Sequence, residues 1–142
     1  MNDIPVLRVG DVHEVEAFLA ERIYEFNAGA TGCFDAASFC ATQHDEAGAI
    51  RAGICGYTWA GCCHVSHLWV EASFRRRGVG ANLLRAAEQH AQSKGCRLMI
   101  LSSHSFQSPA FYERSGFVQQ AVVPDDPPGH ADLVFVKRLR ER

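Results

Sequence analysis

The sequence lacks the features of several common protein classes. It has no run of eighteen apolar residues and no charged-then-apolar pattern at its start, so it predicts neither a membrane span nor a secretory signal. Its six cysteines form no Cys-x-x-Cys pair and have no zinc-site spacing, so we expect free thiols and no metal. A formal net charge of -2 gives no general basic excess, and we expect no nucleic-acid partner. Together these absences predict a soluble, cytoplasmic protein.

Length and composition are typical of one globular domain. The chain has 142 residues, of which 47% are hydrophobic and 21% charged. A chain of this size buries about two-thirds of the surface that it exposes when unfolded. We therefore expect a single domain covering residues 1–142.

Hydrophobic periodicity predicts an α/β protein in which strands alternate with helices through the middle of the chain. The predicted strands cover residues 4–9, 39–44, 49–59, 62–71, 96–102, 117–123 and 133–136. The predicted helices cover residues 12–27, 78–93 and a short segment from 109 to 116. Asp11 is the expected N-cap of the first helix, and Asn27 and Gly29 are expected to end it. These elements favour a mixed sheet with helices on both faces.

The loop between the strand ending at Val70 and the helix from residue 78 has the composition of a phosphate-binding turn. Gly78 and Gly80 leave the main chain accessible at a helix N-terminus, where free N–H groups attract anions, and the arginines at 75–77 add positive charge. The loop is not a dinucleotide fingerprint, because Leu83 stands where a third glycine is needed. No Gly-Lys-Ser/Thr tripeptide of a Walker loop occurs either. We expect a pyrophosphate to bind at this loop.

A second motif, FYERSGF, occupies residues 111–117. Its Tyr112 is either a packing aromatic, like Phe111 and Phe117, or a proton donor. A phenol with a pKa near 10 remains protonated at neutral pH and can protonate a developing anion.

These two motifs, in this order and spacing, resemble the GNAT acetyltransferase superfamily. Arg75, Gly78 and Gly80 fill the fixed positions of its Arg/Gln-x-x-Gly-x-Gly/Ala signature, and Tyr112 falls at the tyrosine of its second motif. The resemblance implies a mostly antiparallel, twisted sheet that is splayed at the acyl-CoA site. It also implies an N-acetyltransferase that moves an acetyl group from acetyl-CoA to a primary amine of a small molecule or peptide, by direct transfer in a ternary complex.

The resemblance also implies which residues hold the cofactor. Tyr112 would protonate the departing thiolate, and Gln107 would contact the pantetheine arm in place of a common asparagine. The remaining expected contacts are Leu68, Trp69, Val70, Arg75, Arg76, Arg77, Gly78, Val79, Gly80 and Ala81. Nothing beside Cys62 and Cys63 marks an activated thiolate, so a covalent acetyl-cysteine is not expected.

His64 is the expected general base, and the sequence leaves two alternatives open. His64 stands on the strand where some members of the superfamily place a glutamate, and His67 and Glu71 are alternatives. In a regular strand residues 64 and 67 face opposite sides, so we expect at most one of them at the cleft. This parity also argues against a two-histidine metal site.

The amine acceptor is not identified by the sequence. Tyr24, Glu25, Asn27 and Trp59 are expected to line its entrance, together with the acidic loop 124–130. A non-catalytic acyl-CoA-binding or sensing module on the same fold is an alternative, as is transfer of a longer acyl group. An exposed edge strand near the carboxyl end would permit a homodimer.

Overall fold

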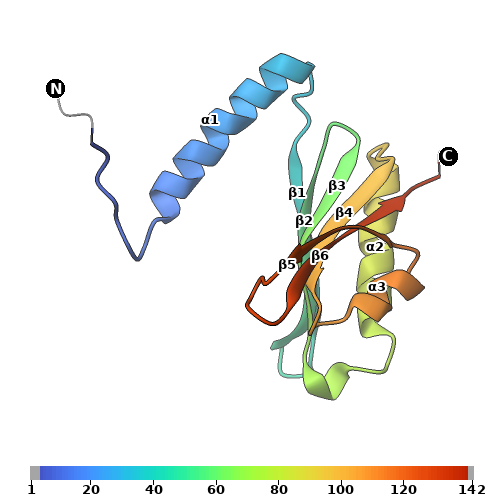
Figure 1. Ribbon diagram of the computed structural model, residues 1–142. Coiled ribbons are helices and arrows are strands. Elements are labelled where there is room, and N and C mark those ends of the chain that lie inside the picture. Colours follow the sequence, from blue (N-terminus) through green and yellow to red (C-terminus); the bar gives the residue numbers. More distant parts are fainter. Residues whose placement is uncertain (1–3, 141–142) are drawn as a thin grey trace. The chain divides into compact units, whose positions relative to one another are not determined.

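The computed structural model describes residues 4–140 and divides the chain after Phe34 into two compact units (Figure 1). The first unit holds one helix, and the second holds the sheet and the remaining helices. No helix within residues 4–140 has both the length and the apolar character that crossing a bilayer requires.

The first unit is built on α1 (His13–Thr31). This helix was expected, but the prediction of Asp11 as its N-cap is wrong, because Val12 holds that position. The Asp11 side chain accepts the His13 N–H at 3.2 Å from one residue further out. The helix runs through Asn27 and Gly29, which were expected to end it, and ends at Gly32, whose φ of 74° is the left-handed conformation that glycine adopts easily. The predicted strand at residues 4–9 is wrong, because a strand needs a partner and the described part of this unit contains no other strand.

The second unit is a six-stranded sheet in the order β1-β2-β3-β4-β6-β5 (Figure 1). Every neighbouring pair is antiparallel except β3 and β4. The strands are β1 (Ala37–His44), β2 (Ile50–Trp59), β3 (Cys62–Val70), β4 (Leu98–His104), β5 (Val118–Pro124) and β6 (Ala131–Arg138). The expected mixed, mostly antiparallel sheet is therefore confirmed.

The helices of this unit pack on one face of the sheet. A short 3-10 turn, η1 (Ala72–Phe74), leads to α2 (Val79–Ser93), which buries Leu83 and Leu84 in the same core as Ile54 of β2. The short α3 (Pro109–Arg114) places Tyr112 against the buried Phe135 of β6, with ring centroids 5.9 Å apart. These buried side chains belong to one cluster, so this face of the sheet holds the core. Burying each large apolar side chain contributes about 1.5–3 kcal/mol.

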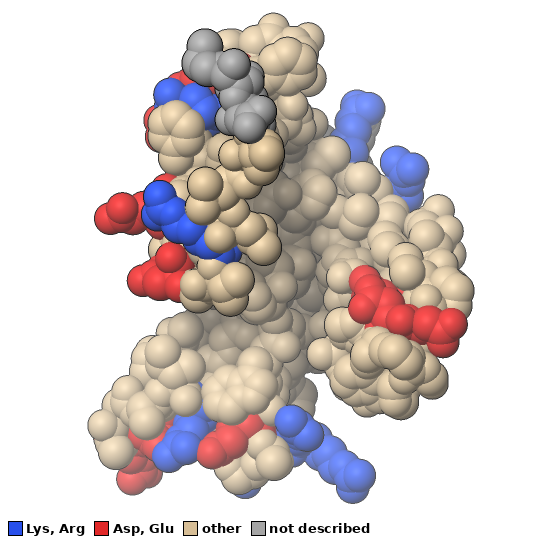
Figure 2. Space-filling view, turned by 60° about the vertical axis from the view of Figure 1, so that its left-hand side comes forward, with Lys and Arg blue, Asp and Glu red and all other residues tan. Residues whose placement is uncertain are grey.

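The opposite face of the sheet is more exposed to solvent. Burial alternates along β2, where Ala52, Ile54 and Thr58 are buried while Cys55 and Tyr57 between them are exposed. All six cysteines are free thiols, as expected. Basic and acidic side chains are interspersed over the surface shown in Figure 2, which agrees with the small net charge.

Candidate active site

The sheet opens between its two parallel strands. Cys62, Cys63 and His64 of β3 pair with Leu98, Met99 and Ile100 of β4, and the pairing then stops. Each strand stays paired to its other neighbour, β3 to β2 as far as Val70 and β4 to β6 as far as His104. The two strands therefore part without fraying and leave free main-chain groups along the inner edge of β3.

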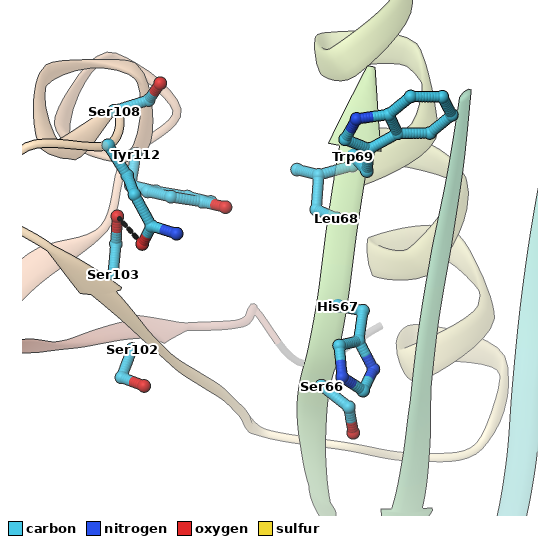
Figure 3. Close-up of a pocket in the computed structure, with 9 residues that line it drawn as sticks. Ser66, His67, Leu68, Trp69, Ser102, Ser103, Ser108 and Tyr112 are labelled. Carbon is cyan, nitrogen blue, oxygen red and sulfur yellow. Dashed lines mark hydrogen bonds between the residues drawn. The ribbon is translucent and has the colours of Figure 1, made fainter. Parts of the chain in front are cut away.

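A pocket of about 280 Å³ occupies this opening (Figure 3). Its lining residues come from β3, from β4 and from the start of α3: Ser66, His67, Leu68, Trp69, Ser102, Ser103, Gln107, Ser108 and Tyr112. The structure thus brings Leu68, Trp69, Gln107 and Tyr112 together, as the sequence predicts. No local pattern marks the four serines as site residues, because their place depends on where the strands separate.

Tyr112 is a packing aromatic that also lines the pocket, and its role as proton donor stays a prediction. Its ring packs against Phe117 and Phe135, at centroid distances of 6.0 and 5.9 Å. Its hydroxyl extends across the pocket toward β3 (Figure 3). Burial raises the pKa of the Tyr112 phenol above its ordinary value of 10.0. The group therefore keeps its proton at neutral pH and can donate it.

A bulge in β3 corrects the expected parity of its two histidines. Cys55 of β2 pairs with His67, and Gly56 pairs with Val65, so Ser66 is an extra residue in β3. His64 and His67 therefore face the same side of the sheet, and the prediction that they face opposite sides is wrong. The bulge requires Gly56, because a Cβ there would collide with the His64 carbonyl oxygen.

Only one of these histidines lines the pocket. His67 does so, directly after the bulge (Figure 3). His64 pairs with Ile100 where β3 and β4 are still joined, and its ring stacks on Tyr57 with centroids 4.7 Å apart. Burial lowers the pKa of the His64 imidazole. The role of His64 as a base stays a prediction.

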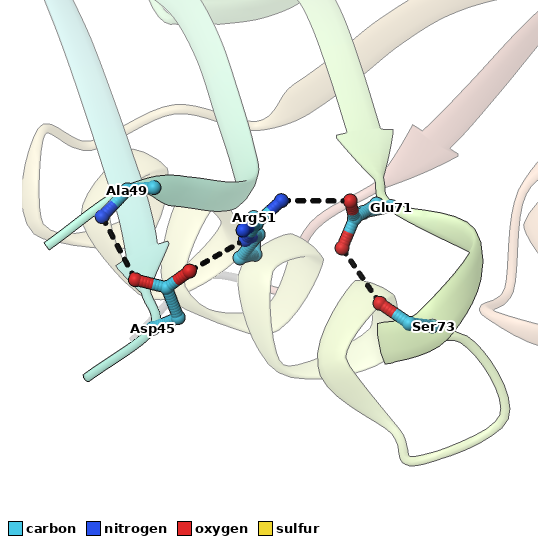
Figure 4. Close-up of polar contacts among 5 residues, drawn as sticks. All are labelled: Asp45, Ala49, Arg51, Glu71 and Ser73. Atoms are coloured by element: carbon cyan, nitrogen blue, oxygen red, sulfur yellow. Dashed lines mark hydrogen bonds and ion pairs between the residues drawn. The ribbon is translucent and has the colours of Figure 1, made fainter. Parts of the chain in front are cut away.

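Glu71, the third candidate base, belongs to an ion-pair network outside the pocket lining (Figure 4). One Arg51 guanidinium lies 2.8 Å from Glu71 and 2.8 Å from Asp45, and Ser73 donates to Glu71 at 2.6 Å. The Ala49 N–H and Arg51 together hold the pKa of Asp45 below its ordinary value. The network ties the β1–β2 turn to the segment that enters loop 75–80, which we call the arginine loop.

The arginine loop has the geometry of an anion site. Gly78 adopts φ 76° as the N-cap of α2, and the helix ladder starts with the Asn82 N–H bonding to the Gly78 carbonyl at 2.9 Å. The N–H groups of Val79, Gly80 and Ala81 precede that bond and have no acceptor within the helix. Arg75 donates to the Val70 carbonyl at 2.9 Å, which fixes its guanidinium at the end of β3. Arg77 stacks over Phe74 at 5.6 Å, and Arg76 completes the cationic stretch.

Gln107 is partly committed to its own loop. Its side-chain carbonyl accepts the His104 N–H at 2.7 Å and lies 3.5 Å from the Ser103 hydroxyl. The amide NH₂ remains as a donor toward a ligand. A contact with pantetheine would therefore run from the Gln107 nitrogen to a ligand carbonyl.

Trp59, the expected acceptor residue of the second unit, does not line the pocket. Trp59 pairs with Cys62 at the β2–β3 turn, where β3 begins, whereas the pocket lies where β3 ends. Tyr24, Glu25 and Asn27 belong to α1 in the first unit, and Glu25 pairs with Arg22 at 2.9 Å. Their acceptor-binding role stays a prediction.

Comparison with known proteins identifies the family. The model of the acetyltransferase (GNAT) family matches residues 11–117. The chain is 37% identical over 95 residues to the blasticidin-S acetyltransferase of Streptomyces morookaense, which covers 66% of this chain and 70% of that protein. It resembles the crystal structure of an acetyltransferase from Bacillus cereus, with 33% identity, a TM-score of 0.79 and coverage of 95% and 98% of the two chains.

A more distant structural match shows the same fold with the cofactor present. A Bacillus anthracis structure solved in complex with acetyl coenzyme A has a TM-score of 0.64, 18% identity, and coverage of 72% of this chain and 63% of that chain. The chain therefore belongs to the acetyltransferase (GNAT) family and is an acyltransferase enzyme.

Proposed function

We propose that this enzyme transfers the acetyl group of acetyl-CoA directly to a primary amine of a small molecule or peptide in a ternary complex. The observation that carries the proposal is the pocket between β3 and β4, where the Tyr112 hydroxyl faces the unpaired edge of β3. The arginine loop follows β3 after the short turn η1, so this stretch of chain connects the proposed reaction site to the proposed phosphate site.

Acetyl-CoA would bind along this path. Its diphosphate would accept hydrogen bonds from the N–H groups of residues 79–81 and would lie beside the positively charged guanidinium groups of residues 75–77. The amides of pantetheine would pair with the edge of β3 at Leu68–Val70, where Arg75 already holds the Val70 carbonyl, and the Gln107 NH₂ would donate to one of their carbonyls. The fit is supported by N–H groups at α2 that have no acceptor within the helix.

Transfer then needs three groups. The amine nitrogen attacks the thioester carbonyl, and main-chain N–H groups at the β3 bulge stabilise the oxyanion. The C–S bond breaks, and the thiolate takes the proton of Tyr112. A raised pKa suits this role because Tyr112 still holds its proton when the thiolate forms.

For the proton on the acceptor amine we favour His67 over His64. His67 lines the pocket beside the bulge, whereas His64 stacks on Tyr57 before the strands separate. A neutral imidazole can take an amine proton directly or through one water. An acetyl-cysteine route is not supported, because burial and the neighbouring Cys96 and Cys62 raise the pKa of Cys63 to about 12.

We also propose that the two units form one domain, as expected from the length. The family match begins in the first unit and ends in the second. The homodimer stays a prediction, supported by β5 at one edge of the sheet.

A thiol-release screen tests the function. Acetyl-CoA is offered with polyamines, aminoglycosides, amino acids and peptide amino termini, and free CoA is measured. Release with one of these classes is expected. CoA binding without release in any class would favour the non-catalytic module, and tighter competition by longer acyl-CoAs in calorimetry would favour a longer acyl donor.

A further inference from the structure

The short helix that carries Tyr112 depends on contacts with the rest of the fold. α3 has six residues, and a helix of fewer than about twelve residues is marginal in water by itself. Its N-cap residue, Ser108, makes no side-chain capping hydrogen bond within residues 4–140. A proton donor must nevertheless be held within about 0.5 Å of its working position. Other elements must therefore fix α3.

The C-terminal end of α3 is held by Lys137 of β6. The Lys137 ammonium donates to the main-chain carbonyl of Ser115, the C-cap residue of α3, at 2.9 Å, and it donates to Glu88 of α2 at 2.8 Å. A cation is favourable at this place, because the C-terminal end of a helix carries partial negative charge. One ammonium group thus joins α2, α3 and β6. We call Lys137, Glu88 and the Ser115 carbonyl the lysine bridge.

The lysine bridge is partly shielded from water. The side chains of Lys137 and Glu88 are 24% and 25% exposed, and both residues line a second pocket of about 320 Å³ together with Leu84 and Phe111. An ion pair covered to this extent is screened less than one on the open surface. The stem of Lys137 also lies directly against Gly116, where an added Cβ would stand 3.1 Å from Lys137 Cε. Packing and charge together therefore hold the lysine in place.

Ser115 is bonded in turn to the main chain of the segment that carries Tyr112. The N–H groups of Ser115 and Phe117 both donate to the Tyr112 carbonyl, each at 3.0 Å. The Ser115 hydroxyl donates to the Phe111 carbonyl at 2.9 Å. A shift of Ser115 would therefore move the backbone from which the Tyr112 side chain extends.

The strand β6 holds Tyr112 at two points. Phe135 packs against the Tyr112 ring with centroids 5.9 Å apart, and Lys137 stands two residues further along the same face of the strand. The first contact fixes the ring, and the second fixes the end of the helix that carries it. Because both contacts come from one strand, the Tyr112 hydroxyl keeps its direction across the pocket (Figure 3).

Lys137 acts on the reaction through Tyr112. It does not line the pocket between β3 and β4, so it does not touch the reacting groups there. We infer that Lys137 is a positioning residue for acetyl transfer: the lysine bridge holds α3 so that the Tyr112 hydroxyl stays directed at the edge of β3. This inference rests on the proposed role of Tyr112 as the group that protonates the departing thiolate.

Matched substitutions at residue 137 test the inference. Lys137→Met removes the ammonium group and keeps a similar stem, whereas Lys137→Arg keeps the charge and the N–H donors. CoA release is measured from acetyl-CoA with the amine that reacts fastest in the screen described above. We expect Lys137→Met to lower kcat by roughly tenfold with the KM for acetyl-CoA changed by less than about twofold, and Lys137→Arg to recover most of the loss. Unchanged kcat would overturn the inference, and a raised KM alone would overturn it in favour of a direct contact with the cofactor.

A double-mutant cycle with Tyr112→Phe separates positioning from general support of the fold. Lys137→Met should lower kcat by roughly tenfold in the wild type but by less than about twofold in Tyr112→Phe, because that variant has no hydroxyl left to position. Equal falls in the two backgrounds would overturn the inference. If Tyr112→Phe by itself leaves kcat unchanged, the proposed role of Tyr112 fails and the inference fails with it.

Amide hydrogen exchange tests the same contact without an activity measurement. Lys137→Met should speed exchange at the Ser115 and Phe117 N–H groups, which bond to the Tyr112 carbonyl, because the end of α3 is no longer held to β6. Exchange at these two groups as slow as in the wild type would overturn the inference.

Arg114→Met is the matched control. Arg114 lines the same second pocket, so this change removes a neighbouring cation but keeps the lysine bridge, and kcat should stay close to that of the wild type. Equal falls in kcat for Arg114→Met and Lys137→Met would overturn the inference in favour of a general effect of charge. The stoichiometry of CoA binding reports the folded fraction of each variant, and a fall in kcat that only matches a loss of binding sites would overturn it in favour of a structural role. Absence of CoA release with every amine would instead count against the proposed acetyl transfer, on which the inference rests.

Discussion

His64 and His67 lie on the same face of β3, because Ser66 adds one residue to the strand between them. The pair is nevertheless divided by the point at which β3 and β4 separate. His64 sits where the strands are joined and stacks on Tyr57, whereas His67 faces the open pocket. One bulge thus gives two similar side chains different environments.

The two histidines should respond differently to substitution. His67→Gln is expected to lower kcat/KM by roughly a hundredfold near neutral pH, because it removes the proposed proton acceptor. His64→Gln is the matched control and should change kcat/KM little, since its ring does not line the pocket. Steady-state kinetics of both variants provide the measurement. The reverse pattern would return the role of base to His64.

Removing the hydroxyl of Tyr112 should affect chemistry but not folding. Tyr112→Phe keeps the ring contacts with Phe117 and Phe135, so the unfolding midpoint and the CoA dissociation constant should stay close to those of the wild type. Turnover should fall by roughly a hundredfold, because the thiolate loses its proton donor. Calorimetry and thiol release measure these effects. Unchanged turnover across a pH series would remove Tyr112 from the mechanism.

The two glycines of the arginine loop are not equivalent. Gly78→Ala should weaken CoA binding and destabilise the fold by about 1 kcal/mol, because φ 76° is strained for any residue with a Cβ. At Gly80 an added Cβ would lie 3.5 Å from Phe111, which is ordinary contact, so Gly80→Ala should bind CoA nearly as well as the wild type. Calorimetric titration with CoA compares the two. Equal losses would contradict this distinction.

The bulge should depend on the absence of a side chain at residue 56. Gly56→Ala is expected to destabilise the protein by about 1–3 kcal/mol, because its Cβ would meet the His64 carbonyl oxygen and the Phe39 ring. Gly53→Ala on the same strand is the control, with a Cβ 3.3 Å from the Ala41 carbonyl oxygen, and should cost less. Urea unfolding of both variants tests the prediction. A larger loss at residue 53 would argue against it.

Acidification should destabilise the fold in part through His64. Burial lowers its pKa in the folded chain below the ordinary value of 6.5, so below pH 6.5 the unfolded chain binds this proton more readily. Stability attributable to His64 is therefore complete above that pH and is lost as the pH falls toward the folded pKa. Urea unfolding between pH 7.5 and 5.5 should show a shallower loss for His64→Gln than for the wild type. Identical slopes would mean that His64 is not linked to folding in this range.

Local signals made part of this protein readable from its residues. The helical period of Val79, Leu83, Leu84 and Ala87 predicted α2, and the glycines before it predicted a turn that opens a helix; the structure confirms both. The ends of the first helix were harder to predict from the sequence. Gly29 costs only about 1 kcal/mol within a helix, whereas Gly32 ends it by adopting a left-handed φ.

Residues close together in the chain were enough to predict the family, most helices and strands, and the two motifs at residues 75–80 and 111–117. Spacing along the chain sets the exposed face in such segments. The bulge at Ser66 and the opening between β3 and β4 became visible only in the folded chain. These features depend on which residues of different strands pair, and pairing is fixed by packing across the whole sheet.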